Sequence, residues 1–348
     1  MINSEFDGRD GRRRAVVIWL LLCCALVATI VVVGGATRLT RSGLSIVEWQ
    51  PLIGAIPPLS EADWQVLLDK YRATPEYKLV NKGMSLDAFK SIFWWEYGHR
   101  LLARLIGAFF LIPLIWFWVR GRLDWGLGLR LLGVFVLGGL QGVLGWYMVK
   151  SGLVDDPKVS HLRLAAHLGL ALLIFWAMLW IALGLLFPSQ QHWTNRLRLT
   201  RGVALALPLL VFIMALSGAL VAGIRAGYAY NTFPLMNGHW IPPELFSIEP
   251  WWRNFFYNMA TVQFDHRLLA YLLVLVTGWL WWRVFANNTS RRARYSATGL
   301  ALALVLQFGL GIATLLNQVP VLLGVLHQGG AVIVFTGAIL TAHALRRG

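Results

Sequence analysis

The sequence predicts an all-α integral membrane protein, with eight transmembrane helices arranged as two pseudo-repeated four-helix bundles. Three observations lead to this prediction: the composition, eight long apolar segments, and motifs that recur in the two halves of the chain. Hydrophobic residues make up 57% of the 348 residues and charged residues only 14%, with a mean hydropathy of +0.61. Soluble proteins carry about 25% charged residues. The chain is therefore too apolar for a water-soluble fold.

Each apolar segment is long enough to cross a bilayer as a helix, which takes roughly 20 residues. The expected spans are 15–37, 97–119, 129–149, 161–187, 203–223, 265–285, 296–316 and 321–344. The first span follows Arg12-Arg13-Arg14, as the apolar core of a signal peptide would. Its apolar run is too long for such a core and lacks a convincing cleavage site, so we expect it to remain as the first helix. Ser60 and Ser85 are expected to cap short loop helices at 61–71 and 86–96.

The basic residues predict the orientation. The formal net charge is +15, but arginine and lysine flank the apolar segments at intervals instead of forming one stripe, which disfavours nucleic-acid binding. Most arginines lie on the side of the two termini, which the positive-inside rule places in the cytoplasm. The long loops 38–96 and 224–264 then face the other compartment. Acidic residues at the N-terminus favour a bacterial inner membrane over a mitochondrial one.

A division near residue 200 gives two halves that resemble each other. Residues 1–200 are expected to form the N-terminal bundle and residues 201–348 the C-terminal bundle. The shared motifs are Gln141-x-x-x-Gly145 with Gln307-x-x-x-Gly311, and His99-Arg100-Leu101 with His266-Arg267-Leu268. Because each half holds four spans, both copies have the same orientation in the membrane, as parallel repeats do.

Four histidines, His99, His167, His266 and His327, fall in the even-numbered spans at matched positions. Each predicted bundle thus carries two histidines on different helices, and no zinc-type spacing is present. Two neutral imidazoles from facing helices suit the two axial positions of a haem. The alternative is that each is a hydrogen-bonded core residue, but the pairing across the repeat favours haem ligation. Glycines near them would admit a flat ring to the backbone: Gly98, Gly107, Gly169, Gly329 and Gly330.

Other polar residues are less informative. Arg100, Arg104, Arg225 and Arg267 could pair with haem propionates or anchor the spans at the interface. The remaining histidines are expected to be solvated or structural: His161, His192, His239 and His343. The only cysteines, Cys23 and Cys24, are expected to be buried hydrophobes, and without a Cys-x-x-Cys-His motif any haem is bound non-covalently.

The two halves differ beside the first histidine of each pair. Glu96 stands three residues before His99, and Gln263 three residues before His266. A carboxylate can take protons, orient water or attack carbon, whereas an amide can only hydrogen-bond. The asymmetry suggests that one haem is acted upon and the other serves as a redox cofactor. The sequence leaves open the alternative that Glu96 caps its helix.

These residues carry a family resemblance over almost the whole chain. The chain resembles the haem A synthase family in its proteobacterial and mitochondrial branch. The motifs are Gly34-Gly35-Ala36-Thr37-Arg38-Leu39-Thr40-x-Ser42-Gly43-Leu44-Ser45, Phe93-Trp94-Trp95-Glu96-Tyr97-x-His99-Arg100, Arg163-Leu164-Ala165-Ala166-His167-Leu168-Gly169, Asn231-Thr232-Phe233-Pro234-Leu235-Met236, Gln263-Phe264-x-His266-Arg267 and His327-Gln328-Gly329-Gly330. Some bacterial members have a cysteine pair in the first external loop, and loop 38–96 of this chain has none.

The resemblance implies an oxidoreductase that converts the C8 methyl group of haem O to a formyl group by successive hydroxylations, giving haem A. It implies that His266 and His327 ligate a haem b cofactor, that His99 and His167 contact the iron of the substrate haem, and that Glu96 is catalytic. Implied partners are haem O, membrane lipid, a haem O synthase and cytochrome oxidase assembly components. Association between copies fits a membrane bundle, but nothing in the sequence sets its number. Two other functions remain open, a di-haem electron-transfer cytochrome and a haem carrier without substrate chemistry.

Overall fold

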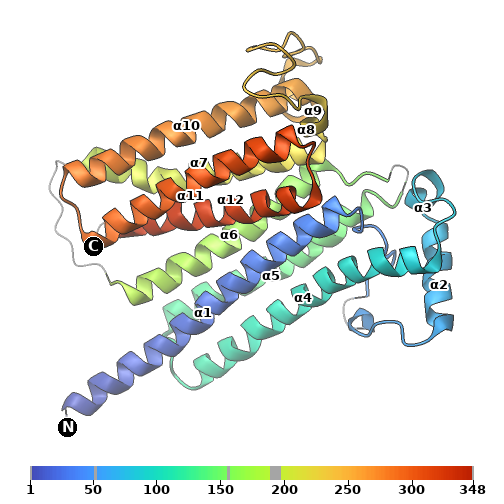
Figure 1. Cartoon of the computed structure of the whole chain (residues 1–348). Helices are drawn as coiled ribbons and strands as arrows, with labels where there is room; N and C mark the ends of the chain where they lie inside the picture. Colours follow the sequence, from blue (N-terminus) through green and yellow to red (C-terminus); the bar gives the residue numbers. More distant parts are fainter. Residues whose placement is uncertain (1, 51–52, 155–156, 189–196, 347–348) are drawn as a thin grey trace.

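The computed structural model describes residues 2–50, 53–154, 157–188 and 197–346, with side chains from residue 13 onward. The described residues form helices and loops but no strand (Figure 1). Eight of the described helices are long and apolar enough to cross a membrane, so the chain is a multi-pass membrane protein. They are α1 (Ile2–Leu39), α4 (Leu86–Val119), α5 (Trp125–Lys150), α6 (His161–Leu186), α7 (Arg198–Gly223), α10 (Met259–Ala286), α11 (Arg291–Leu316) and α12 (Val321–Ala344).

Side-chain caps define where several of these helices begin. A short polar side chain accepts a main-chain N–H of the first turn and satisfies one of the donors that a helix start leaves unpaired. Such caps precede five of the long helices, at Ser85, Asp124, Ser160, Asn258 and Ser290. The eight spans predicted from hydropathy are confirmed. Most helix ends lie within several residues of the expected ones, but α1 and α4 begin more than ten residues earlier.

One predicted boundary is wrong. The loop helix expected at 86–96 and the span expected at 97–119 are a single helix, α4, which begins directly after its cap Ser85. The helix continues through Gly98 without a break, and the extension is covered by α2 (Glu61–Arg72). A satellite core there packs Trp64 of α2 against Phe89 and Phe93 of α4, outside the apolar belt. The other expected loop helix is confirmed as α2, which has a capping box at Ser60.

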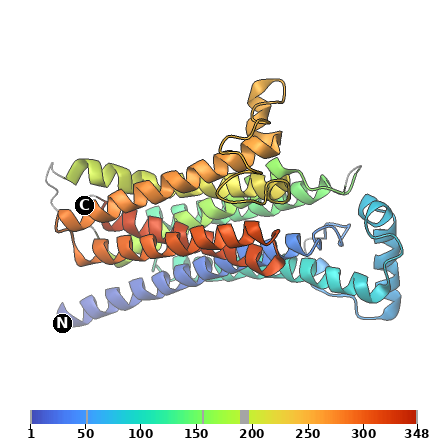
Figure 2. The same cartoon turned by 45° about the horizontal axis from the view of Figure 1, so that its top comes forward.

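The long helices pack as two closed rings of four. In the first ring α1 contacts α4, α4 contacts α5, α5 contacts α6, and α6 returns to α1. In the second ring α7 contacts α10, α10 contacts α11, α11 contacts α12, and α12 returns to α7. The rings meet where α1 and α6 pack against α12 and α7 (Figures 1 and 2). Each ring is built from one predicted half of the chain; the repeat relationship and the boundary at residue 200 remain predictions.

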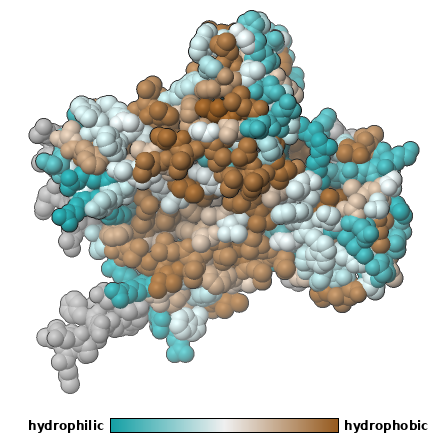
Figure 3. Space-filling view, viewed as in Figure 1, coloured by the Kyte–Doolittle hydropathy of each residue, from teal (hydrophilic) through white to brown (hydrophobic). Residues whose placement is uncertain are grey.

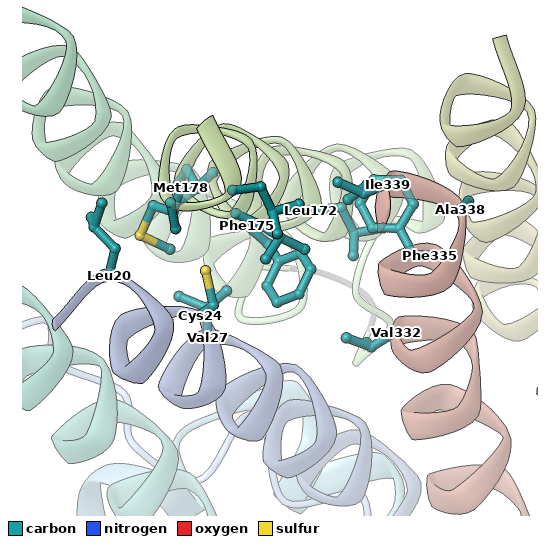
Figure 4. Close-up of a cluster of buried hydrophobic side chains, with 14 of the residues drawn as sticks. Leu20, Cys24, Val27, Leu172, Phe175, Met178, Val332, Phe335, Ala338 and Ile339 are labelled. Atoms are coloured by element: carbon teal, nitrogen blue, oxygen red, sulfur yellow. The ribbon is translucent and has the colours of Figure 1, made fainter. Parts of the chain in front are cut away.

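The main hydrophobic core lies at the seam between the rings. Figure 4 shows Cys24 of α1, Phe175 and Met178 of α6 and Phe335 and Ile339 of α12 converging there. Burial at this seam holds the rings together through close packing. Cys23 lies in the same core, and both cysteines are free and buried, as expected for small hydrophobes.

The ends of the helices are polar and the middle is apolar. Figure 3 shows a brown belt across the bundle with teal residues at both ends. The first turns of α1 and the last turns of α12 lie at one end (Figure 1). The connection that carries α2 and α3 (Pro75–Leu79), and the one that carries α8 (Ala226–Ala229) and α9 (Asn254–Tyr257), extend from the opposite end. We refer to this opposite end as the loop end.

Candidate functional site

The four histidines of the sequence prediction lie on diagonal helices of the two rings. His99 is on α4 and His167 on α6, which are separated in the first ring by α1 and α5. His266 is on α10 and His327 on α12, which occupy the same diagonal of the second ring. The two members of each pair thus belong to the same ring and lie on opposite helices of it. The fold therefore brings together the histidines that the sequence paired.

Each imidazole rests on a glycine of a neighbouring helix. A Cβ atom added to these glycines would lie 3.0 Å from Cε1 of His99 at Gly34, 3.0 Å from Cε1 of His167 at Gly145, 3.2 Å from Cε1 of His266 at Gly218, and 2.9 Å from Cε1 of His327 at Gly311. A Cβ atom at the 2.9 Å of Gly311 is closer than real contacts allow, and at the other three glycines it would be tighter than most real contacts, so a larger residue would press against each ring. Sequence reasoning missed this role of the glycines, although two of them stood in the repeated Gln-x-x-x-Gly motif.

The five glycines that the sequence analysis expected to admit a flat ring divide into two groups. Gly169 packs against Leu216, and Gly330 makes room for the side chain of Gln307, so both are used for contact between helices. Gly329 likewise faces Val32. Only Gly98 and Gly107, both on α4, have no described atom within 4 Å of an added Cβ. Contacts between helices thus lie at Gly169, Gly329 and Gly330, and the expected role of the five glycines in admitting a flat ring stays a prediction.

A glutamine one turn before the glycine holds the second histidine of each pair. The Nε2 of Gln141 donates to the main-chain carbonyl of His167 at 2.9 Å, and that of Gln307 donates to the main-chain carbonyl of His327 at 2.8 Å. Both amides also approach the ring, at 3.4 Å from Nε2 of His167 and 3.1 Å from Nδ1 of His327. The repeated motif thus supplies an amide and an open backbone face to the same histidine.

Nδ1 of the first histidine has different surroundings in the two rings. Nδ1 of His266 lies 3.2 Å from the hydroxyl of Ser217. Nδ1 of His99 is buried and has no hydrogen-bond partner among the described residues, and the same holds for Nδ1 of His167. In the second ring both Nδ1 atoms therefore face a polar side chain, whereas in the first ring neither does.

The carboxylate of Glu96 accepts four hydrogen bonds from the described residues. Its Oε2 accepts the main-chain N–H of Ser45 at 2.7 Å, the hydroxyl of Ser45 at 2.7 Å and the N–H of Ile46 at 2.9 Å. Its Oε1 pairs with Arg100 at 2.6 Å, and the residue is 3% exposed. Glu96 lies ten positions after the first residue of α4, Leu86, so it does not cap the helix. That alternative is wrong, because Ser85 provides the cap.

The amide of Gln263 has a smaller set of partners in the second ring. Its Nε2 donates to the carbonyl of Tyr230 at 2.8 Å, and its Oε1 lies 3.5 Å from Arg267. Arg267 also donates to the carbonyls of Thr232 and Pro234. The buried amide of Gln263 thus bridges a loop carbonyl and an arginine, which is a structural role. The matching carboxylate of Glu96 in the first ring accepts hydrogen bonds from four donors.

Three of the four arginines considered as propionate partners donate to carbonyls of the loops. Arg100 donates to the carbonyls of Ile46 and Glu48 as well as to Glu96, and Arg104 donates to the carbonyl of Gln50. With Arg267 they hold the loop-end segments against α4 and α10. Arg225 is the first residue after the end of α7 that adopts the left-handed conformation, with φ of 60°.

The other histidines take structural or exposed positions, as expected. His161 lies edge-on to Tyr257, at 4.8 Å between ring centroids. His343 is buried against Trp180 and accepts from Arg292, and His239 is exposed in the second loop-end segment. His192 lies outside the described residues.

The two histidine pairs fit a haem by their donor set and their setting. The part of the chain that the structure describes holds no group of three or more histidine, cysteine, aspartate or glutamate side chains suited to a bare metal ion. A haem brings its own in-plane nitrogens and needs only axial ligands, which two imidazoles from opposed helices can provide. At His99 the buried Nδ1 and the glycine face agree with a ring that presents its other edge to such a group.

Fold and site together define a multi-pass helical membrane protein with two intramembrane histidine pairs, one of them beside a buried carboxylate. Residues 17–339 match the COX15-CtaA family, described as cytochrome oxidase assembly protein, and the chain belongs to this family. It is 58% identical over 315 residues to a heme A synthase of Nitrosospira multiformis, covering 90% of this chain and 88% of that protein. It is also 55% identical to a heme A synthase of Nitrosomonas eutropha over 90% of this chain and 88% of that one, and 52% identical to one of Parvibaculum lavamentivorans over 90% and 89%.

Proposed function

We propose that this protein is a haem A synthase, an oxidoreductase that converts the C8 methyl group of haem O to the formyl group of haem A. The observation that carries the proposal is the unequal surroundings of two equivalent histidines. Beside His99 lies a buried carboxylate with four donors, and beside His266 lies an amide. Family membership and the names of the relatives support the same reaction.

In this proposal the first ring binds the substrate and the second ring the cofactor. His99 and His167 contact the iron of haem O, while His266 and His327 ligate a resident haem b. The haem b supplies one-electron redox chemistry when bound. Each of two successive hydroxylations would add one water-derived oxygen to the methyl carbon, release two protons and pass two electrons to an acceptor outside this chain. The resulting geminal diol would then lose water to give the aldehyde.

The contribution of Glu96 follows from its partners. The described groups within hydrogen-bonding distance of its carboxylate all donate, so both oxygens act as acceptors. Held in this way on α4 three residues before His99, the carboxylate is placed to orient water and to take up a proton released during hydroxylation. Burial keeps bulk water away from this step.

The matched contacts of the two rings support the predicted repeat. Gly34 and Gly218 face the first histidine of each pair, and Gly145 and Gly311 face the second. We accordingly assign residues 1–200 to the substrate bundle and residues 201–348 to the haem b bundle. We also assign the protein to the bacterial inner membrane with both termini in the cytoplasm. A haem O synthase would supply its substrate, and cytochrome oxidase would receive its product.

The test is mass analysis of haem extracted from membranes that contain this protein and a haem O synthase. Haem A is expected with the wild type and not with Glu96→Gln, whose amide cannot take a proton. Both proteins are expected to keep the absorption spectrum of a bis-histidine haem b. Haem B and haem O alone from a well-expressed wild type would overturn the proposal and favour an electron carrier or a haem carrier.

A further inference from the structure

The first histidines of the two pairs occupy equivalent settings that differ in one neighbour. Gly34 on α1 contacts Cε1 of His99, and Gly218 on α7 contacts Cε1 of His266. The residue before the glycine is Val33 in the first ring and Ser217 in the second.

The alignment of these residues does not depend on the histidines. The two glycines are 218 − 34 = 184 positions apart. The same offset relates Arg41 to Arg225, since 225 − 41 = 184, and these two arginines have positive φ angles of 54° and 60° after their helices end. Val33 and Ser217 therefore occupy equivalent positions in the two rings.

The hydroxyl of Ser217 determines whether Nδ1 of His266 has a hydrogen-bond acceptor. A histidine that ligates iron through Nε2 carries its proton on Nδ1, and a partner that accepts this proton fixes the ring and strengthens the ligand. Ser217 lies 3.2 Å from Nδ1 of His266 and can accept in this way. Valine cannot, and Nδ1 of His99 is buried without a partner among the residues that the structure describes. The nearby carboxylate of Glu96 is engaged by Ser45, Ile46 and Arg100 instead.

The second histidines of the pairs show no such difference in residue type. His167 and His327 are each held by a glutamine and rest on a glycine, and the residue before that glycine is leucine in both rings, Leu144 and Leu310. Among the residues that hold the four imidazole rings, the two rings of helices therefore differ in hydrogen-bonding capacity at one pair of equivalent positions, Val33 and Ser217.

We infer that Ser217 is a positioning residue that makes the second ring retain its haem, and that Val33 leaves the first ring able to release one. This inference rests on the proposed function, because only a synthase needs one resident haem and one that enters and leaves. A more basic, fixed imidazole binds ferric iron more tightly and lowers the midpoint potential of the haem. An imidazole with an unpaired Nδ1 is a weaker ligand, which suits a substrate that must depart as product.

The test uses the full-length protein purified from cells that also make haem O, with apomyoglobin as a haem acceptor. Ser217→Val is expected to speed the loss of haem b to apomyoglobin by about 10–100-fold and to raise its midpoint potential. Ser217→Thr, which keeps the hydroxyl, is expected to restore both values towards the wild type. A structural defect alone would not raise the midpoint potential in Ser217→Val and leave it near the wild-type value in Ser217→Thr.

The reciprocal variant tests the first ring. Val33→Ser is expected to slow the transfer of haem O and haem A to apomyoglobin and to increase the amount that remains after purification. The inference would be overturned if Ser217→Val kept the wild-type midpoint potential and the wild-type rate of haem b loss. It would also be overturned if Val33→Ser left the transfer of haem O and haem A unchanged. If Ser217→Val does not fold, wild-type retention of haem O and haem A in Val33→Ser still overturns it. If the wild type formed no haem A, the proposed function would be contradicted. The comparison of Ser217→Val with the wild type would still test how haem b is held, because it does not depend on haem A formation.

Discussion

Glu96 accepts both the main-chain N–H and the hydroxyl of Ser45, each at 2.7 Å from the same carboxylate oxygen. Ser45 follows α1 and is fully enclosed, at 2% exposed, so the contact ties the loop after the first span to the N-terminal third of α4. The sequence motif that ends in Ser45 and the motif that contains Glu96 are thereby one structural unit. The position of the carboxylate depends on this loop as much as on its own helix.

Removal of the Ser45 hydroxyl is expected to weaken catalysis without loss of haem. A hydrogen bond to a charged group is worth about 1.5–3 kcal/mol, which corresponds to a fall in rate of about tenfold or more. Ser45→Ala should therefore convert haem O about tenfold more slowly, and Ser45→Thr should stay closer to the wild type. The measurement is the initial rate of haem A formation, with the haem b spectrum as the control. Equal rates for Ser45→Ala and the wild type would show that the hydroxyl does not support Glu96.

The two histidine pairs are expected to separate spectroscopically. His266→Ala and His327→Ala should each remove the low-spin haem b spectrum, because each deletes an axial ligand. His99→Ala and His167→Ala should keep that spectrum and lose haem A formation. Visible absorption of the purified reduced protein distinguishes the cases. A haem b spectrum that survives His266→Ala or His327→Ala contradicts the assignment of the second ring.

The glycine contacts give a prediction with a matched control. Gly311→Ala places a methyl group 2.9 Å from Cε1 of His327, which must displace the ring. We expect loss of most haem b although alanine favours the helix by about 1 kcal/mol. Gly309→Ala on the same helix has no described atom within 4 Å of the added Cβ and should keep its haem. Haem content per protein after purification is the measurement, and equal content in the two variants contradicts the expected role of the contact.

Glu76 on α3 gives a prediction for pH. It lies outside the spans and is 6% exposed, and burial raises its pKa from 4.5 to about 7, against the hydrogen bond from Tyr71. The folded protein therefore binds this proton more tightly than the unfolded chain. The contribution of Glu76 to the free energy of unfolding consequently falls as pH rises from about 4.5 to 7 and stays low above that.

Glu76→Gln removes this titration and should raise Tm by a few degrees at pH 8 and by much less at pH 5. Thermal unfolding of the purified protein at the two pH values, compared with the wild type, is the measurement. Asp87→Asn, at an exposed position in the first turn of α4, serves as the control. A Tm difference that is the same at both pH values would contradict the titration of Glu76.

The orientation can be tested with two reporters. A fluorescent protein fused after the C-terminus should fluoresce, because it folds in the cytoplasm. Alkaline phosphatase inserted after Gly83, in the exposed turn between α3 and α4, should be active because that enzyme needs the periplasm. The positive-inside rule predicts this pair of results, and the reverse pair would invert the topology.

Hydropathy and capping residues by themselves determined the eight spans, because a helix must be apolar over the thickness of the bilayer and must satisfy its first donors. They also placed His167 and His327 correctly, each six positions after the first residue of its helix, His161 and Val321. The sequence also predicted the helix start after Ser85, but not that the helices expected at 86–96 and 97–119 are one, because the extension is stabilised by α2 and not by lipid.

Only the tertiary structure decided which side chains meet across helices. Contact between Gly34 and His99, or between Ser217 and His266, depends on how each helix is rotated about its axis and packed in its ring. That rotation is set by the core at the seam between α1, α6 and α12, where segments distant from one another in sequence pack together. The sequence could therefore pair the histidines but could not predict which ring nitrogens are paired and which are left buried.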